Sequence, residues 1–264
     1  MRCLNVIAPG LAMLSHAVPE AAAATPDTPV KIVLVGDSTI AQQTGWGGAF
    51  CDLHVTQYVA CVPMGRGGRS TKTYRSEGAW TLALDEASTA GYPARYVLID
   101  MGHNDKSMNP TVGTGLYTDF PANLTRMVRD VRDRGAIPVL VTPLSTRHFS
   151  GGKLADSMIP WAEVVRNVAS QTNTLVLDLN KASEQLFARL GPVRSMDFEG
   201  RPLTQQEIAA AKAGTTLAAR QGGSKLGNQA DYLHLNARGA DDIASLVAKL
   251  LAARIPALAA HVFP

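Results

Sequence analysis

Short apolar runs alternate along the chain with segments whose apolar residues recur every three or four positions. Each run has the length of one strand, and the runs cover residues 30–36, 56–62, 94–102, 136–143 and 174–179. Continuous apolar runs are typical of strands that are buried on both faces, as in a parallel sheet with helices on either side. The runs therefore predict a five-stranded parallel sheet.

The intervening segments predict the helices. We expect helices over 120–134, 156–171, 181–190 and 237–254. In the last one, apolar residues follow the i, i+3, i+4 spacing of a helix packed on one side: Ile243, Leu246, Val247, Leu250 and Leu251. Strands that alternate with helices predict an α/β fold, a three-layer α/β/α sandwich with right-handed crossovers.

Two segments interrupt this alternation. Residues 103–119 are rich in Asn, Gly and Thr and predict a loop after the third strand, and residues 191–230 form a long insertion before the last helix. Within the insertion, residues 204–220 predict an amphipathic helix. Long connections in compact domains are often lids or binding loops, and a surface excursion without a role is an equal alternative.

Composition limits the class of protein. The 264 residues are 46% hydrophobic and 18% charged, which fits one globular domain with a full core. The net charge is +3 and the basic residues are scattered, so no nucleic-acid or membrane-surface patch is indicated. No segment after the N-terminal region is long and apolar enough to span a membrane. We expect no nucleic-acid or membrane partner, and a monomer.

The N-terminal residues differ in character from the rest. Arg2 precedes an apolar segment at 3–14, and an alanine-rich stretch offers an A-x-A cleavage site close to Ala24. This pattern predicts a secretory signal peptide over residues 1–24, a single domain over 25–264, and a secreted or periplasmic protein. A disordered extension is the alternative.

Cysteine usage leaves the redox state open. Removal of the signal peptide would leave Cys51 and Cys61, which an oxidising compartment would permit to form a disulfide. Two free buried thiols are an equal alternative. No cysteine or histidine spacing suggests a metal site.

The predicted strands end in polar residues, and ligands of open parallel sheets gather at those ends. The first strand ends in Gly36-Asp37-Ser38, the second leads into 64–70, the third into 102–105 and the fourth into 144–149. Each feature has an ordinary explanation when taken alone. Asp37 and Ser38 are good N-caps for a following helix, Gly68 suits a turn, and Asn104 suits an Asx-turn.

A serine becomes a nucleophile only when a base removes its proton and a third group orients that base. The sequence "DYLHLN" at 231–236 offers both, because Asp231 can bind the Nδ1–H of His234 and leave Nε2 for Ser38. The tetrahedral oxyanion also needs hydrogen-bond donors. Candidates are the Ser38 amide, the Gly68 amide, which no Cβ shields, and the Asn104 side chain.

These four segments, in this order, resemble the blocks of the SGNH (GDSL-type) hydrolases: Ser38 in "GDST", Gly68 in "GGRS", Asn104 in "GHND", and Asp231 with His234 in "DYLH". The resemblance implies the flavodoxin-like fold of that superfamily. It extends to the rhamnogalacturonan acetylesterase branch through Gly45-Trp46-Gly47, "GGRSTKTYRSEGAW" and "GHND". The departures are the insertion at 191–230 and "VPMG" at 62–65, where such enzymes tend to carry an Asn-containing strand end.

What the resemblance implies is a serine esterase that hydrolyses O-acetyl esters on a cell-wall polysaccharide through an acyl-serine, without a cofactor. Candidate substrate contacts are Asp37, Arg69, His103 and Arg147, with Arg66 and Arg75 as further partners for uronic-acid carboxylates. Trp46 and Trp80 are candidates to line the cleft. Surface arginines are usually solvated, however, and tryptophans of α/β domains are usually in the core.

Two other functions are compatible with the sequence. One is an esterase, lipase or thioesterase of the same superfamily that acts on small acyl esters. The low aromatic content of 6% argues against lipid binding, although a lid built from 204–220 would favour it. The other is a carbohydrate-binding relative without activity, which the presence of every block residue disfavours.

Overall fold

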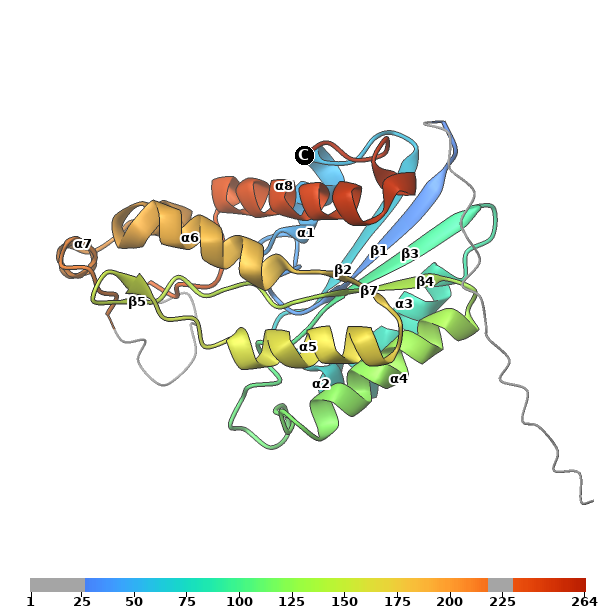
Figure 1. The fold of residues 1–264 in the computed structure, drawn as a ribbon, viewed down its shortest axis with the longest axis horizontal. Coiled ribbons are helices and arrows are strands. Elements are labelled where there is room, and N and C mark those ends of the chain that lie inside the picture. The colour runs from blue at the N-terminus through green and yellow to red at the C-terminus, as the bar shows by residue number, and fades with distance from the viewer. Residues whose placement is uncertain (1–26, 218–229) are drawn as a thin grey trace, which may run out of the picture.

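A computed structural model describes residues 27–217 and 230–264. Its main sheet has five parallel strands in the order β2-β1-β3-β4-β7, and Figure 1 shows them fanned between two helical layers. The strands are β1 (Val30–Gly36), β2 (Val59–Gly65), β3 (Ala94–Asp100), β4 (Ile137–Val141) and β7 (Leu175–Leu177). The predicted fold class is confirmed, because this is the strand order of a flavodoxin-like sheet.

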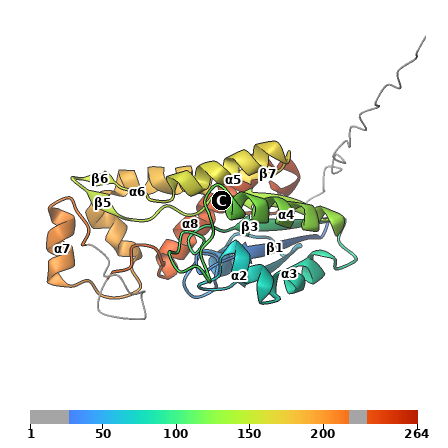
Figure 2. The ribbon, with the colours of Figure 1, turned by 90° about the horizontal axis from the view of Figure 1, so that it is seen from below.

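The two faces of the sheet are covered by different helices. One face carries α1 (Gly47–Leu53), α6 (Leu179–Ser195) and α8 (Ala237–Arg254), and the other carries α2 (Thr71–Ser76), α3 (Ala79–Ala87), α4 (Asp119–Asp133) and α5 (Ile159–Gln171). Figures 1 and 2 show these layers from two directions. Sequence periodicity predicted α8 with its observed bounds and α4 within one residue, because both bury one apolar stripe.

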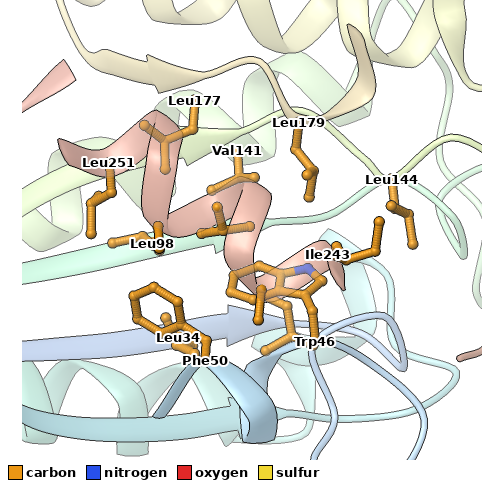
Figure 3. Close-up of a cluster of buried hydrophobic side chains, with 14 of the residues drawn as sticks. Leu34, Trp46, Phe50, Leu98, Val141, Leu144, Leu177, Leu179, Ile243 and Leu251 are labelled. Carbon is orange, nitrogen blue, oxygen red and sulfur yellow. The ribbon is translucent and has the colours of Figure 1, made fainter. Parts of the chain in front are cut away.

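Alternate residues of β1 enter separate cores. Ile32 and Leu34 pack with the helices of the first face, whereas Val33 and Val35 pack with those of the second. Figure 3 shows the first core, where Leu34 lies beside Trp46 and Phe50 and under α8. A strand buried on both sides has no polar face, which explains its unbroken apolar run.

Some elements differ from the sequence-based expectation. Strand β2 begins at Val59, three residues later than predicted, because residues 57–58 form a turn and the amide of Val59 donates to the Thr56 carbonyl. Helix α6 runs beyond its predicted end through a kink at Gly191, whose φ is 69°. Elements absent from the prediction are α2, α3, the hairpin strands β5 (Phe149–Ser150) and β6 (Lys153–Leu154), and the short 3₁₀ helices η1 (Met196–Phe198) and η2 (Pro256–Leu258).

Part of the insertion is described by the structure. The amphipathic helix predicted over 204–220 is observed only in its first half, as α7 (Gln205–Lys212), which begins with a capping box between Thr204 and Glu207. Residues 213–217 are not helical. Residues 218–229 and the predicted signal peptide at 1–24 lie outside the described residues.

Helix α1 and strand β2 are joined by a covalent bond. Cys51 and Cys61 form a disulfide with a Cα–Cα distance of 5.4 Å, a separation at which two cysteines bridge without backbone movement. Of the two states that the sequence left open, the structure therefore has the disulfide.

Two features are absent from residues 27–217 and 230–264: a membrane-spanning helix and a cluster of metal-binding side chains. No helix there is long and apolar enough to cross a bilayer. In the same ranges, no group of three or more His, Cys, Asp or Glu side chains is arranged to hold a metal ion.

Candidate active site

The chain turns sharply where β1 ends. A Cβ at Gly36 would lie 2.5 Å from the Asp100 carbonyl oxygen, so only glycine fits between the adjoining strands. The Asp37 carboxylate then accepts hydrogen bonds from the amide and hydroxyl of Thr39, at 2.9 and 2.8 Å. Successive turns follow Ser38 and the next helix begins only at Gly47. The ordinary explanation, that Asp37 or Ser38 caps a helix that follows directly, is therefore wrong.

Two glycines allow these turns to fold back against the strand end. A Cβ at Gly45 would lie 2.0 Å from the Thr39 carbonyl oxygen, and one at Gly47 would lie 2.2 Å from that of Ile40. Between them, Trp46 is fully buried and its indole N–H donates to Asp100. The Gly-Trp-Gly sequence thus fixes the loop that presents Ser38.

Ser38, His234 and Asp231 form a continuous hydrogen-bonded chain. His234 Nε2 lies 2.7 Å from Ser38 Oγ, and His234 Nδ1 lies 2.7 Å from Asp231 Oδ2. The other carboxylate oxygen of Asp231 accepts the amides of Leu233 and His234 at 2.8 and 2.7 Å. A proton on Nδ1 satisfies Asp231 and leaves Nε2 free to accept the serine proton, which is the arrangement that a general base requires.

The pKa values of Asp231 and His234 support this arrangement. The hydrogen bond that His234 donates to Asp231 raises the pKa of His234 above its ordinary value of 6.5, although burial opposes the shift. Burial alone would raise the pKa of Asp231, but its hydrogen bonds with the His234 ring and with backbone amides lower it to about 2. Asp231 therefore stays ionised and stabilises a positive charge on His234.

Two backbone amides beside Ser38 are available as donors. Throughout the described residues, neither the Ser38 nor the Gly68 amide donates to a protein acceptor. Gly68 has a φ of +79°, which glycine adopts without strain, and a Cβ on its neighbour Gly67 would lie 3.6 Å from the Ser38 Cβ. The glycine loop therefore lies directly against the serine.

Asn104 connects this loop to the end of β3. Its side-chain NH₂ donates to the Arg69 carbonyl at 3.3 Å, and the same side chain lies beside the carboxyl of Asp37. The structure therefore brings Asn104 to the region of Ser38 and Gly68, as the sequence predicted, and its NH₂ group is a third candidate donor.

Asp105 is a buried residue whose structural role the sequence reasoning missed. Its carboxylate accepts the amide and hydroxyl of Thr71 and the hydroxyl of Thr114. Burial raises its pKa to about 6, against the effect of these hydrogen bonds. By tying the start of α2 to the loop after β3, Asp105 holds the Gly68 and Asn104 segments together. The available signal was a carboxylate directly after Asn104.

Several candidate substrate contacts are buried. Asp37 is fully enclosed, and burial raises its pKa. Arg147 is also fully buried, because Glu199 and backbone carbonyls of residues 233 and 234 bind its guanidinium. Trp46 and Trp80 belong to the two cores, and Trp80 donates to Asp130. None of these four side chains is free to contact a polysaccharide, so the expectations for them are wrong.

Other candidates remain accessible. Arg69 has a side chain 41% exposed, which donates to Glu77 and to the Gly67 carbonyl in the loop beside Ser38. Arg66 is exposed in the same loop, whereas Arg75 on α2 donates to Asn123. His103 is partly exposed, and its Nε2 contacts the Leu144 carbonyl at 2.9 Å. Burial lowers its pKa to about 4, so the ring is neutral.

Comparison with known proteins identifies relatives along most of the chain. Residues 34–241 match the model of the GDSL-like Lipase/Acylhydrolase family, a range that contains Ser38 and His234. The probable rhamnogalacturonan acetylesterase YesY of Bacillus subtilis is 28% identical over 83% of this chain and 90% of its own. The rhamnogalacturonan acetylesterase RhgT of the same organism is 31% identical over 63% of this chain and 72% of its own.

A solved structure has the same fold. The crystal structure of protein YxiM of Bacillus subtilis aligns with a TM-score of 0.64 and 23% identity. The alignment covers 85% of this chain and 56% of that one, so the present chain spans little more than half of that protein. At this identity the likeness concerns the fold alone.

Proposed function

The chain belongs to the GDSL-like Lipase/Acylhydrolase family, and from this premise we propose that it removes O-acetyl groups from a cell-wall polysaccharide, specifically pectic rhamnogalacturonan. It is a carboxylic ester hydrolase of the SGNH type. The observation that carries the proposal is the uninterrupted hydrogen-bonded chain from Asp231 through His234 to Ser38. Beside it lie the Ser38 and Gly68 amides, which donate to no acceptor within the described part of the chain.

In the proposed first half of the reaction, His234 Nε2 accepts the Ser38 proton while Oγ attacks the acetyl carbonyl carbon. The carbonyl π electrons move to oxygen, and the resulting oxyanion is stabilised by the amides of Ser38 and Gly68 and by the Asn104 NH₂. The tetrahedral intermediate then collapses. The bond to the sugar oxygen breaks, and His234 gives its proton to that oxygen, which leaves an acetyl-serine.

In the second half, His234 Nε2 takes a proton from water, and the hydroxide attacks the acetyl-serine carbonyl. A second oxyanion forms and accepts hydrogen bonds from the same three donors. The bond between the acetyl carbon and Ser38 Oγ then breaks, and His234 returns the proton to the serine. Asp231 remains ionised throughout, in agreement with its pKa of about 2. The products are acetate and the deacetylated sugar.

The choice of substrate rests on the relatives and on charge. Two relatives at 28% and 31% identity are named as rhamnogalacturonan acetylesterases. Rhamnogalacturonan carries uronic-acid carboxylates, which arginines bind bidentately. Arg69 is accessible in the loop beside Ser38, and we assign it the role of a carboxylate contact. His103, partly exposed beside Asn104, is assigned a neutral hydrogen-bonding contact to the sugar.

We also propose that the protein acts outside the cytoplasm, in the periplasm or after secretion. The disulfide between Cys51 and Cys61 supports this location, because such bonds persist in oxidising compartments. The N-terminal sequence supports it further through the signal-peptide pattern at 1–24. Fractionation of expressing cells, with N-terminal sequencing of the exported protein, tests the location and the cleavage site together.

Acetate release is the decisive test of function. The mature protein is incubated with acetylated rhamnogalacturonan, acetylated xylan and p-nitrophenyl acetate, with Ser38→Ala as the blank. We expect release from the pectic substrate to exceed release from xylan, and Ser38→Ala to lose all activity with its fold unchanged. Hydrolysis of the small ester alone would support the alternative of a general acyl esterase. Turnover by Ser38→Ala would refute the acyl-serine mechanism.

A further inference from the structure

Arg147 and Glu199 form a buried ion pair directly under the loop that carries Asp231 and His234. Arg147 Nη2 lies 2.7 Å from Glu199 Oε1, and the two side chains are 0% and 4% exposed. Arg147 follows β4, whereas Glu199 follows η1 in the insertion at 191–230. Burying two charges carries a large desolvation cost, so a buried pair is weak evidence of a contribution to stability. Its hydrogen-bond partners indicate another role.

The pair binds the backbone of all four residues from Asp231 to His234. Glu199 accepts the amides of Asp231 and Tyr232 at 3.2 and 3.1 Å. The Arg147 guanidinium donates to the carbonyls of Leu233 and His234 at 3.0 and 2.9 Å. The backbone amide of Arg147 donates to the Tyr232 carbonyl at 2.8 Å. The carboxylate thus binds the first two amides and the guanidinium the last two carbonyls.

The loop needs such support because its backbone is strained. Tyr232 has a φ of 56°, a left-handed conformation that non-glycine residues rarely adopt and that persists only where the surroundings enforce it. This conformation lets the Asp231 carboxylate turn back to accept the His234 amide and ring nitrogen. If the backbone relaxed, the imidazole would move relative to Ser38.

We propose that Arg147 and Glu199 are positioning residues that hold the 231–234 loop in the conformation in which His234 faces Ser38. This role rests on the proposed function, since it requires His234 to be the base. It also assigns a positioning role to part of the insertion, because that segment supplies Glu199. Asn236, the N-cap of α8 two residues after the loop, donates to the Glu199 carbonyl at 3.0 Å and so connects the two segments again.

The main test variant is Glu199→Gln, which keeps the size of the side chain but replaces one acceptor oxygen by a donor. Arg147→Lys keeps the charge but loses the fork that reaches two carbonyls. The double variant Arg147→Met with Glu199→Leu removes both charges, which usually preserves stability at buried pairs. The control is Glu86→Gln, which removes the charged partner of the buried Lys31 at the opposite end of β1, while Thr89 still accepts a hydrogen bond from that ammonium.

Two readouts separate positioning from simple destabilisation. The first is kcat and KM for p-nitrophenyl acetate, a substrate too small to depend on sugar contacts. The second is the rate at which a fluorophosphonate ester modifies Ser38, which depends on the base but not on the glycan. Misplacement of a catalytic group by about 1 Å can cost ~10²-fold in rate. We therefore expect kcat and the modification rate to fall by about 10²-fold, with KM within about threefold of wild type.

Comparison with Glu86→Gln decides whether Arg147 and Glu199 position the loop or only stabilise the fold. Glu86→Gln should lower the melting temperature while its kcat stays at the wild-type value. If folded Glu199→Gln and Arg147→Lys also keep the wild-type kcat and modification rate, the pair is only structural and the inference is overturned. Should either single variant fail to fold, the double variant decides by the same criteria. Failure of the proposed function is distinguishable, because wild type would then lack activity or Ser38→Ala would retain it.

Discussion

Replacing Asp231 by Asn tests whether the loop sets the tautomer of His234. Asn has the shape of Asp, but one oxygen becomes an NH₂ group that only donates. In the structure, Asp231 Oδ2 faces His234 Nδ1 at 2.7 Å, and Oδ1 accepts the amides of Leu233 and His234 at 2.8 and 2.7 Å. The asparagine must therefore turn its NH₂ group either to the two amides or to the ring.

The hydrogen bonds decide which orientation is populated. If the NH₂ group turned to the backbone, two hydrogen bonds would be replaced by donor–donor contacts. Each replacement would cost about 1.5–3 kcal/mol, or about 3–6 kcal/mol in total. The NH₂ therefore faces the ring, Nδ1 must accept, and the proton moves to Nε2, where it prevents His234 from taking the serine proton. At about 1.36 kcal/mol per tenfold change, kcat/KM should fall by about 10²–10⁴-fold.

The same substitution should change the pH dependence. The hydrogen bond that His234 donates to Asp231 is the main cause that raises the pKa of His234 above 6.5, and burial opposes it. Since the base must be neutral, kcat/KM of the wild type should rise with pH through this raised pKa. In Asp231→Asn the charged partner is gone and burial remains, so the residual activity should have its acid limb at lower pH.

The assay is kcat/KM for p-nitrophenyl acetate between about pH 5 and pH 9, for wild type and variant, with thermal melts to confirm folding. A variant within about threefold of wild type at its own optimum would refute the tautomer argument. An acid limb that stays at the wild-type position would refute the assignment of the titrating group to His234.

Three further predictions concern stability. Gly45→Ala places a Cβ 2.0 Å from the Thr39 carbonyl oxygen, so urea unfolding should show a loss of about 3 kcal/mol or more; an unchanged midpoint would contradict the close approach. Cys51→Ser with Cys61→Ser opens a loop with a sequence separation of 10 and should lower the free energy of unfolding by about 2–3 kcal/mol. Reductant should then lower the melting temperature of wild type but not of this variant. Burial lowers the pKa of His103 from 6.5 to about 4. The contribution of the neutral ring to the free energy of unfolding is therefore present above pH 6.5 and is lost as the pH falls toward 4, by up to about 3 kcal/mol. His103→Gln should flatten the decline in unfolding free energy across that interval, and an equally steep curve would count against the assignment.

The sheet was predictable because its strands are buried on both faces, which leaves continuous apolar runs in the sequence. Helix α8 was predictable for a related reason, since its buried residues recur at helical spacing. Helix α2 has only six residues and begins with a capping box, and α3 follows Gly78 in a left-handed conformation. Short helices of this kind bury too few residues to produce a clear period.

The meeting of Ser38 with His234 was predictable from the resemblance of "GDST" and "DYLH" to the blocks of the SGNH hydrolases. Which arginines are buried and which are exposed was not predictable from the sequence. Arg69 and Arg147 both follow predicted strands, but one side chain is half-exposed and the other fully buried. What buries Arg147 is Glu199, which lies 52 residues away in a segment without a recognisable pattern. Long-range pairing of two charges leaves no local signal.

Several unfavourable local features of the fold lie around Ser38. Asp37 and Asp100 are fully buried, and one carboxylate oxygen of each has no hydrogen-bond partner among residues 27–217 and 230–264. Burial raises both pKa values. Tyr232 has a left-handed backbone, and the Arg147–Glu199 pair is fully desolvated. A core selected for stability alone would hold apolar side chains at such positions. Features that break local rules together at one place indicate selection for geometry there, and here that geometry is the short contact between His234 and the serine.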